Sequence, residues 1–142
     1  MSVESVDAVE RSVHKTNEWL SELAGELDED REEAWRILKA FLQVLRDELV
    51  VDEAAHLAAQ LPLVLRGAFY EGFDPGRQPT KLRQRDRFLT VLAERARVPG
   101  PADAERAAEA ATHLLRRHVT EGELDDVLAQ LPSEVREVLV QG

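Results

Sequence analysis

The sequence predicts an all-α protein, a helical bundle made of two tandem pseudo-symmetric multi-helix repeats. Ala, Leu, Glu and Arg dominate the chain, and all four are good helix formers, whereas β-branched runs with period-two alternation are missing. The tetrapeptide Ala-Gln-Leu-Pro occurs at 59–62 and again at 129–132, an offset of 70 residues. Self-similarity at a fixed offset is the sequence signature of a repeated structural unit.

Residues on both sides of the tetrapeptide recur at the same offset. The pairs are Ala34 with Ala104, Arg46 with Arg116, Glu53 with Glu123, Leu65 with Val135, and Arg66 with Arg136. Closer to the N-terminus the offset is 69, which one extra residue in the turn 98–101 explains. We therefore expect a single domain over residues 1–142, with repeat 1 at 15–72, a linker at 73–80 and repeat 2 at 81–140.

Each repeat is expected to contain two longer helices followed by two short ones. The first helix is the least regular, because its apolar stripe drifts near Thr16 and Asn17, which predicts a kink or a break. The second begins after Asp28 or Asp30, whose carboxylate can accept bonds from free amide groups at a helix start. Its apolar residues recur at intervals of three and four, namely Ala34, Ile37, Leu38, Phe41, Leu42, Leu45 and Leu49.

A short third helix is predicted over 52–61. It ends at Pro62 because the proline ring disfavours the α conformation in the residue before it, and Pro62 can itself start the fourth helix. The stretch 72–79 is rich in turn residues and is expected to be the loop that crosses between the repeats.

The second repeat shows matching signals. Pro101 lies near the first turn of an alanine-rich helix, where its missing N–H costs little. Thr120 and Glu123 have the spacing of a capping box at the start of the next helix. That helix is predicted to run to Leu131, and Pro132 opens a last short helix.

Length, charge and residue content narrow the function classes. A chain of 142 residues can bury roughly 68–70% of its unfolded surface without metal or disulfide help. Absence of cysteine excludes a disulfide framework and a thiol nucleophile. No apolar run approaches the roughly 20 residues of a membrane span, so we expect a cytoplasmic protein. We also expect that it uses no cofactor. The net charge of −10 disfavours generic nucleic-acid binding.

Two like-spaced polar sets mark the helix hinges. They are Gln60, Leu61, Pro62 and Arg66 in the first repeat, and Gln130, Leu131, Pro132 and Arg136 in the second. In the structural interpretation Gln caps the carbonyls of the preceding helix, Arg pairs with a carboxylate or a helix C-terminus, and Pro shapes the hinge. In the functional interpretation the sets form a pair of anion or partner sites.

The first hinge carries an aromatic cluster that the second lacks. Its candidate binding residues are Arg66, Phe69, Tyr70, Glu71 and Phe73. Because the cluster breaks the repeat, it serves a purpose that the second copy does not share. It can line a pocket or anchor a partner, as buried aromatic and arginine side chains often do. It can equally fill the gap between the two repeats.

The segment 77–97 carries seven basic and two acidic residues in an otherwise acidic chain. Lys81, Arg83 and Arg85 are its candidate binding residues. Such a segment can attract phosphate or an acidic partner. It can also face the acidic stretch 26–33, within the chain or across a dimer.

Glu53 and His56 have the i, i+3 spacing of the metal-ligating helix motif of di-iron bundles, and their equivalents are Glu123 and Asp126. A di-iron site needs two such pairs plus two more carboxylates, and chance matches are common in a chain this rich in Glu. We therefore expect no metal site. No Ser-His-acid set, phosphate-cradling glycine loop or zinc-hydrolase signature is present.

The segment 54–73 combines the Gln-Leu-Pro hinge with Arg66-Gly67 and Tyr70-Glu71-Gly72-Phe73, followed by a Pro-Gly loop and the basic stretch. In these features the chain resembles the bacterial family catalogued as domain of unknown function 2267, over residues 15 to 140. Many relatives have Trp where Phe73 stands, a mild departure. The resemblance supports the helical fold and implies no activity, ligand or catalytic residue.

The favoured function is a non-catalytic protein-interaction or oligomerisation module that binds a protein partner or itself. The first alternative is a metal- or small-ligand-binding protein or an enzyme that uses the cluster around Glu53, His56, Arg66 and Tyr70. The second is nucleic-acid binding through the basic segment 77–97.

Overall fold

The computed structural model describes residues 6–80 and 82–140, and over these residues the fold is all-α, as predicted. The first four helices are α1 (Asp7–Leu27), α2 (Arg31–Asp47), α3 (Val51–Ala59) and α4 (Leu63–Tyr70). After the short turn η1 (Pro75–Arg77) come α5 (Arg85–Ala96), α6 (Pro101–His118), α7 (Glu121–Gln130) and α8 (Ser133–Val140). No helix in the described part of the chain is long and apolar enough to cross a bilayer.

Local sequence explains several of the helix starts. Asp30 accepts a hydrogen bond from the N–H of Glu33 at 2.8 Å and so begins α2. Thr120 accepts one from the N–H of Glu123 at 3.3 Å and so begins α7. Pro101 occupies the first turn of α6. These three predicted starts are confirmed.

The first helix differs from the prediction. It is continuous, so the kink or break expected near Thr16 and Asn17 is wrong. The Thr16 hydroxyl donates to the carbonyl of Ser12 at 2.8 Å, one turn earlier. This bond gives the buried hydroxyl a partner without interrupting the helix. α1 ends instead at Asp28, which adopts the left-handed conformation with φ 56°.

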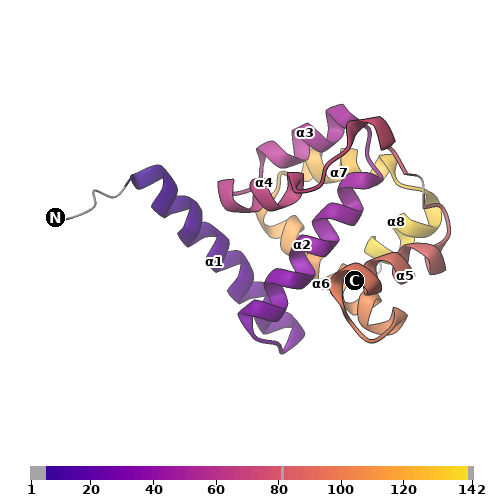
Figure 1. Ribbon diagram of the computed structural model, residues 1–142, viewed down its shortest axis with the longest axis horizontal. Helices are drawn as coiled ribbons and strands as arrows, with labels where there is room; N and C mark the ends of the chain where they lie inside the picture. The colour runs from indigo at the N-terminus through magenta and orange to yellow at the C-terminus, as the bar shows by residue number, and fades with distance from the viewer. Residues whose placement is uncertain (1–5, 81, 141–142) are drawn as a thin grey trace.

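Helices from both halves of the chain share one core. α1 packs on α2, α4 and α6, and α2 packs on α5 as well as on α4 and α6. The short helices α3 and α7 pack on each other at one end of the molecule (Figure 1). The bulkiest fully buried side chains are Trp19, Phe41, Phe69 and Phe88. Because helices of one half pack on helices of the other, the described residues share one hydrophobic core.

The crossing loop (residues 71–84) is held to the C-terminal end of α2. Gln78 donates to the carbonyl of Arg46 at 2.6 Å. The buried Glu48 carboxylate accepts from the Thr80 hydroxyl at 2.7 Å and from a backbone N–H of the loop at 2.8 Å. Burial raises the pKa of the Glu48 carboxyl. These bonds hold Gln78, Thr80 and Leu82 against the end of α2.

Leu61 and Leu131 close the two hinges, and each is only 2% exposed. Truncation removes buried apolar surface and leaves a cavity, so Leu61→Ala and Leu131→Ala should each lower the free energy of unfolding by about 2–5 kcal/mol. Urea unfolding measures the loss. Val51→Ala is the matched control, because Val51 is 41% exposed, and it should change stability little. Near-zero losses at the hinges would contradict their assigned burial.

Candidate functional site

The hinge glutamines join the two halves of the chain. Gln60 follows α3, and its side chain accepts from the backbone N–H of Thr120 at 2.8 Å and donates to the Thr120 hydroxyl at 3.1 Å. Gln130 ends α7, and its side chain accepts from the N–H of Val50 at 3.1 Å. Thr120 and Val50 are the residues that precede α7 and α3. Each glutamine thus satisfies a free N–H at the start of the other short helix.

This geometry corrects the structural interpretation of the glutamines, which expected each one to cap carbonyls of its own helix. The arginines perform that role, as predicted. Arg66 donates to three carbonyl oxygens at the end of α3, at 3.0, 3.3 and 3.2 Å. Arg136 donates to the carbonyl of Leu131 at 3.1 Å. Pro62 and Pro132 directly precede α4 and α8.

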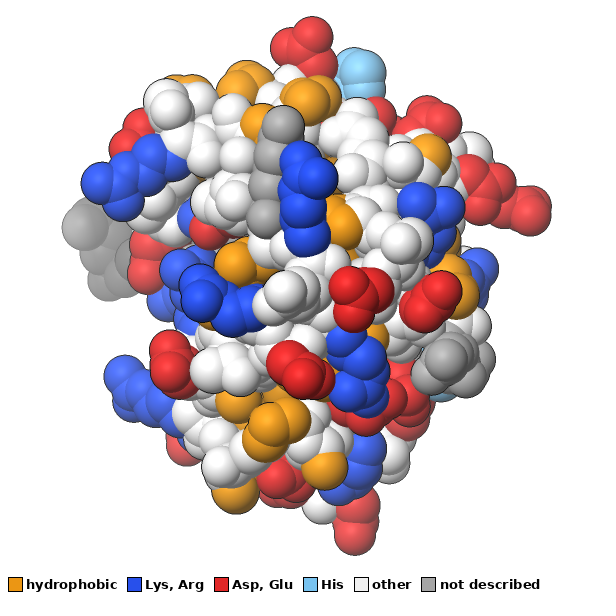
Figure 2. Space-filling view, turned by 90° about the vertical axis from the view of Figure 1, so that its right-hand side faces the viewer, with side chains coloured by type: hydrophobic (Ala, Val, Ile, Leu, Met, Phe, Trp, Pro, Cys, Tyr) orange, Lys and Arg blue, Asp and Glu red, His pale blue; other side chains and the backbone are white. Residues whose placement is uncertain are grey.

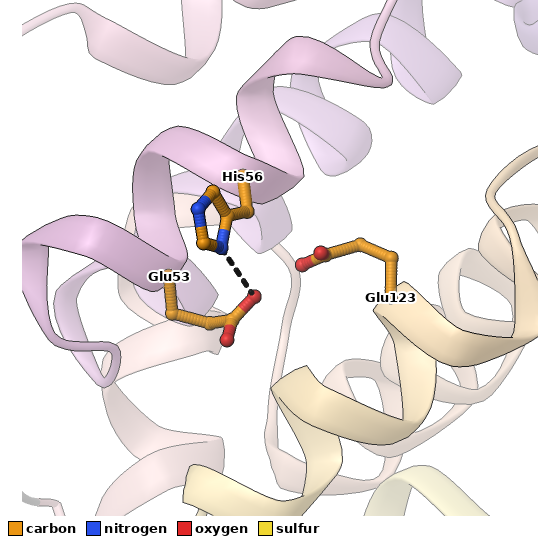
Figure 3. A group of neighbouring side chains, drawn as sticks. All are labelled: Glu53, His56 and Glu123. Carbon is orange, nitrogen blue, oxygen red and sulfur yellow. Dashed lines mark ion pairs between the residues drawn. The ribbon is translucent and has the colours of Figure 1, made fainter.

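The α3–α7 junction buries two glutamates, Glu53 of α3 and Glu123 of α7, each 8% exposed. Figure 3 shows both carboxylates and the His56 ring directed toward a common space. The Oε2 atom of each glutamate is buried without a hydrogen-bond partner. His56 Nδ1 lies 3.8 Å from Glu53 Oε2, and donor atoms of the three residues lie within 4.8 Å of one another. We call these three residues the junction cluster.

Burial, followed by the neighbouring Glu53 and Asp126 carboxyl groups, raises the pKa of Glu123 to about 8. Glu123 is therefore largely protonated at neutral pH. Among the described residues the ion-pair partner of Glu53 is His56, and Glu123 has no Lys or Arg partner. The arrangement can hold a proton, or a cation in its place.

Sequence reasoning paired Glu53 with His56 but missed Glu123 as their neighbour. The i, i+3 spacing places two residues on one helix face, whereas Glu123 arrives through the contact of α3 with α7. The sequence carried a signal, since Glu53 and Glu123 stand 70 residues apart, the offset at which the Ala-Gln-Leu-Pro tetrapeptide recurs. Arg66 and Tyr70, the other members of the predicted ligand set, make their described contacts elsewhere, at the end of α3 and among the Phe rings.

The aromatic cluster of the first hinge packs on α2. Phe69 is fully buried and Phe73 is half-buried. Arg46, only 3% exposed, donates to the carbonyl of Phe69 at 2.7 Å, and its guanidinium carbon lies 5.5 Å from the centre of the Phe73 ring. The equivalent residue Arg116 is exposed. The aromatic segment therefore packs against the buried Arg46 side chain, whereas Arg116 in the second half is exposed.

Two members of the cluster reach the surface. Tyr70 is 37% exposed, and its ring meets the Phe69 and Phe73 rings edge-on at 5.3 and 5.5 Å. Glu71 forms an ion pair with Lys39 of α2 at 2.9 Å. Their role in binding stays a prediction.

The basic segment 77–97 pairs with carboxylates outside the acidic stretch 26–33. The described pairs at longer range than adjacent residues are Arg77 with Asp74 at 3.4 Å, Arg85 with Glu105 at 2.7 Å and Arg95 with Asp47 at 3.6 Å. Within the chain, these arginines therefore do not pair with the acidic stretch. A contact with that stretch across a dimer stays a prediction. Figure 2, which views the side of the molecule where α5 and α8 lie, shows basic and acidic side chains interspersed.

Two further candidate binding residues belong to this segment. Lys81 lies outside the described residues. Arg83 lines an open cavity of about 670 Å³ between the crossing loop and the second hinge, together with Glu48, Gln130 and Ser133. Nucleic-acid or ligand binding through this segment stays a prediction.

We expect Glu123→Gln to flatten the pH dependence of stability. The folded protein keeps the Glu123 proton up to a pKa of about 8, whereas the unfolded chain releases it near the ordinary pKa of 4.5. Because the folded state binds more protons between these values, wild-type stability falls as pH rises through this window. Glutamine removes that cost, so the variant should be more stable by about 1–3 kcal/mol at alkaline pH.

Urea unfolding in metal-free buffer across the same window measures this effect. Asp125→Asn is the matched control, because Asp125 is an exposed carboxylate on the same helix. Parallel pH profiles for wild type and Glu123→Gln would contradict the assigned protonation.

Comparison with known proteins identifies the family of this chain. A family model described as "Uncharacterized conserved protein (DUF2267)" matches residues 16–138, a span that includes both hinges, the crossing loop and the junction cluster. No curated protein matches the chain. The match confirms the resemblance recognised in the sequence. The chain belongs to the DUF2267 family of uncharacterized conserved proteins.

Proposed function

We propose that the protein is a non-catalytic protein-interaction module that associates with a second copy of itself through the N-terminal half of α1 and the start of α4. The observation that carries this proposal is an exposed apolar face on these two elements. Its residues, between 39% and 61% exposed, are Val6, Val9, Val13, Leu63 and Val64. We call this surface the α1–α4 face. Contiguous exposed apolar patches often mark interaction sites.

The α1–α4 face continues the stripe by which α1 packs into the core. Val9 and Val13 are followed at helical spacing by Thr16 and Leu20, which are buried. The first turns of α1 extend past the rest of the molecule (Figure 1), and Val9 and Val13 of this stripe are exposed. Val9 and Val13 are therefore apolar residues on a helix face that packs into the core further along α1.

The start of α4 widens this stripe into a patch. The hydroxyl of Ser12 accepts a hydrogen bond from the N–H of Val64 at 2.9 Å. This bond places Leu63 and Val64 beside the middle of α1. The aromatic hinge offers less apolar surface, because Phe69 is fully buried.

A second copy is the partner we infer. An apolar stripe on a helix can pair with the same stripe of another copy about a two-fold axis, the commonest symmetry of homo-oligomers. The patch is small, so we expect a weak dimer with a dissociation constant of about 10–100 µM. Val6, Val9 and Val13 precede the family match, which begins at residue 16, whereas Leu63 and Val64 lie within it.

We also infer that the chain arose by tandem duplication, with repeats at 15–72 and 81–140 joined by the linker 73–80. Reciprocal contacts support this inference. α1 packs on α6 while α2 packs on α5, and α3 packs on its own equivalent α7. The contacts of Gln60 and Gln130 with the opposite helix starts are likewise reciprocal. Residues 7–14 precede repeat 1, and α5 has no counterpart of them because it is shorter than α1.

The double variant Val9→Ser/Val13→Ser should weaken self-association by about tenfold or more, because it removes apolar surface from the centre of the patch. Sedimentation equilibrium from about 5 to 500 µM measures it. Val51→Ser, which changes a valine that is 41% exposed on α3, is the matched control. Wild-type protein that stays monomeric throughout this range would contradict the proposal.

The duplication implies that the two hinge glutamines contribute alike. Gln60→Ala and Gln130→Ala should each lower the free energy of unfolding by about 0.5–2 kcal/mol, the usual cost of losing a cap at a helix start. Thermal unfolding of the two single variants measures the losses. A loss at one hinge with none at the other would count against equivalent roles.

A further inference from the structure

The geometry points to a divalent metal site at the α3–α7 junction, in which Glu53, His56 and Glu123 bind a single transition ion, with Zn²⁺ as the best fit. This inference goes beyond self-association and does not depend on it. It also replaces the expectation from sequence that the chain holds no metal site. That expectation considered a di-iron centre, whereas three ligands suffice for one ion.

Distances within the junction cluster suit one ion. Its three donor atoms lie within 4.8 Å of one another. In a tetrahedral site with bonds of about 2.1 Å, the ligand atoms are about 3.4 Å apart, so the three side chains must close by up to about 1.4 Å to hold the ion. The His56 side chain, 68% exposed, is free to rotate and supplies that movement.

Two buried carboxylate oxygens lack a hydrogen-bond partner, and this distinguishes the cluster from an ordinary group of surface acids. Glu53 and Glu123 are each 8% exposed, and the Oε2 atom of each has no hydrogen-bond donor. A buried polar atom without a partner costs free energy. Figure 3 shows these carboxylates approaching the same space from α3 and α7. A cation placed there would satisfy both oxygens at once.

Neighbouring groups already orient the ligands. The Gln130 amide donates to Glu53 Oε1 at 3.4 Å, which leaves Oε2 free, and the same side chain is anchored by the N–H of Val50. Thr120 caps the helix start that carries Glu123. Hydrogen bonds that hold a ligand in place typically contribute 10- to 100-fold to metal affinity. Both halves of the chain therefore help to arrange the site.

The donor set selects the class of metal. Carboxylates alone would favour Mg²⁺ or Ca²⁺, but imidazole favours Zn²⁺ and other first-row transition ions. The chain has no cysteine, so the ligands are nitrogen and oxygen only. His56 lies at the exposed edge of the cluster, which leaves room for water to complete the coordination.

Isothermal titration of tag-free protein with Zn²⁺ tests the inference. We expect one ion per chain, with an affinity at least about tenfold higher than for Mg²⁺ or Ca²⁺. Glu123→Gln and His56→Asn should each weaken Zn²⁺ binding by about tenfold or more. Glu137→Gln, at an exposed carboxylate of α8, is the matched control and should bind as wild type does.

Thermal unfolding provides an independent readout. Zn²⁺ should raise the melting temperature of wild type and of Glu137→Gln, but not that of Glu123→Gln, because only an ion bound to the folded state stabilises it. His56→Asn changes an exposed side chain and so tests the site without disturbing the core. Unchanged Zn²⁺ affinity in Glu123→Gln, equal affinity for Mg²⁺, or no saturable binding would each overturn the inference.

Discussion

The packing of α3 against α7 is the contact on which the arrangement of the molecule depends. Each short helix begins with N–H groups that its own turns cannot satisfy. Gln60 and Gln130 supply acceptors from the opposite half, so each half completes the other. Neither half alone would supply acceptors for these N–H groups. The two halves also share one hydrophobic core.

The same contact brings two buried acidic side chains together. Glu53 lies on α3 and Glu123 on α7, so packing these helices together brings two carboxyl groups into a buried space. A protein gains no stability from two facing acids, and the raised pKa of Glu123 reflects that cost. Groups held at such a cost are frequent at functional sites. The proposed metal site gives this arrangement a purpose.

The two halves of the chain differ in two features. Arg46 is buried and binds the aromatic hinge, whereas Arg116 is exposed. The extra length of α1 carries the exposed valines of the α1–α4 face, whereas α5 has no such extension. Packing explains the first departure. The second adds nothing to the described core, which is why we assign it to self-association.

The sequence by itself determined features that act over short stretches of the chain, at most eight residues. It predicted the helices, the caps at Asp30 and Thr120 and the arginine contacts at the hinges, because helix periodicity and capping bonds are local. Only the tertiary structure decided the partners of Gln60 and the meeting of Glu53 with Glu123. Those contacts span 60 or 70 residues along the chain and arise from how helices pack, which local spacing does not specify.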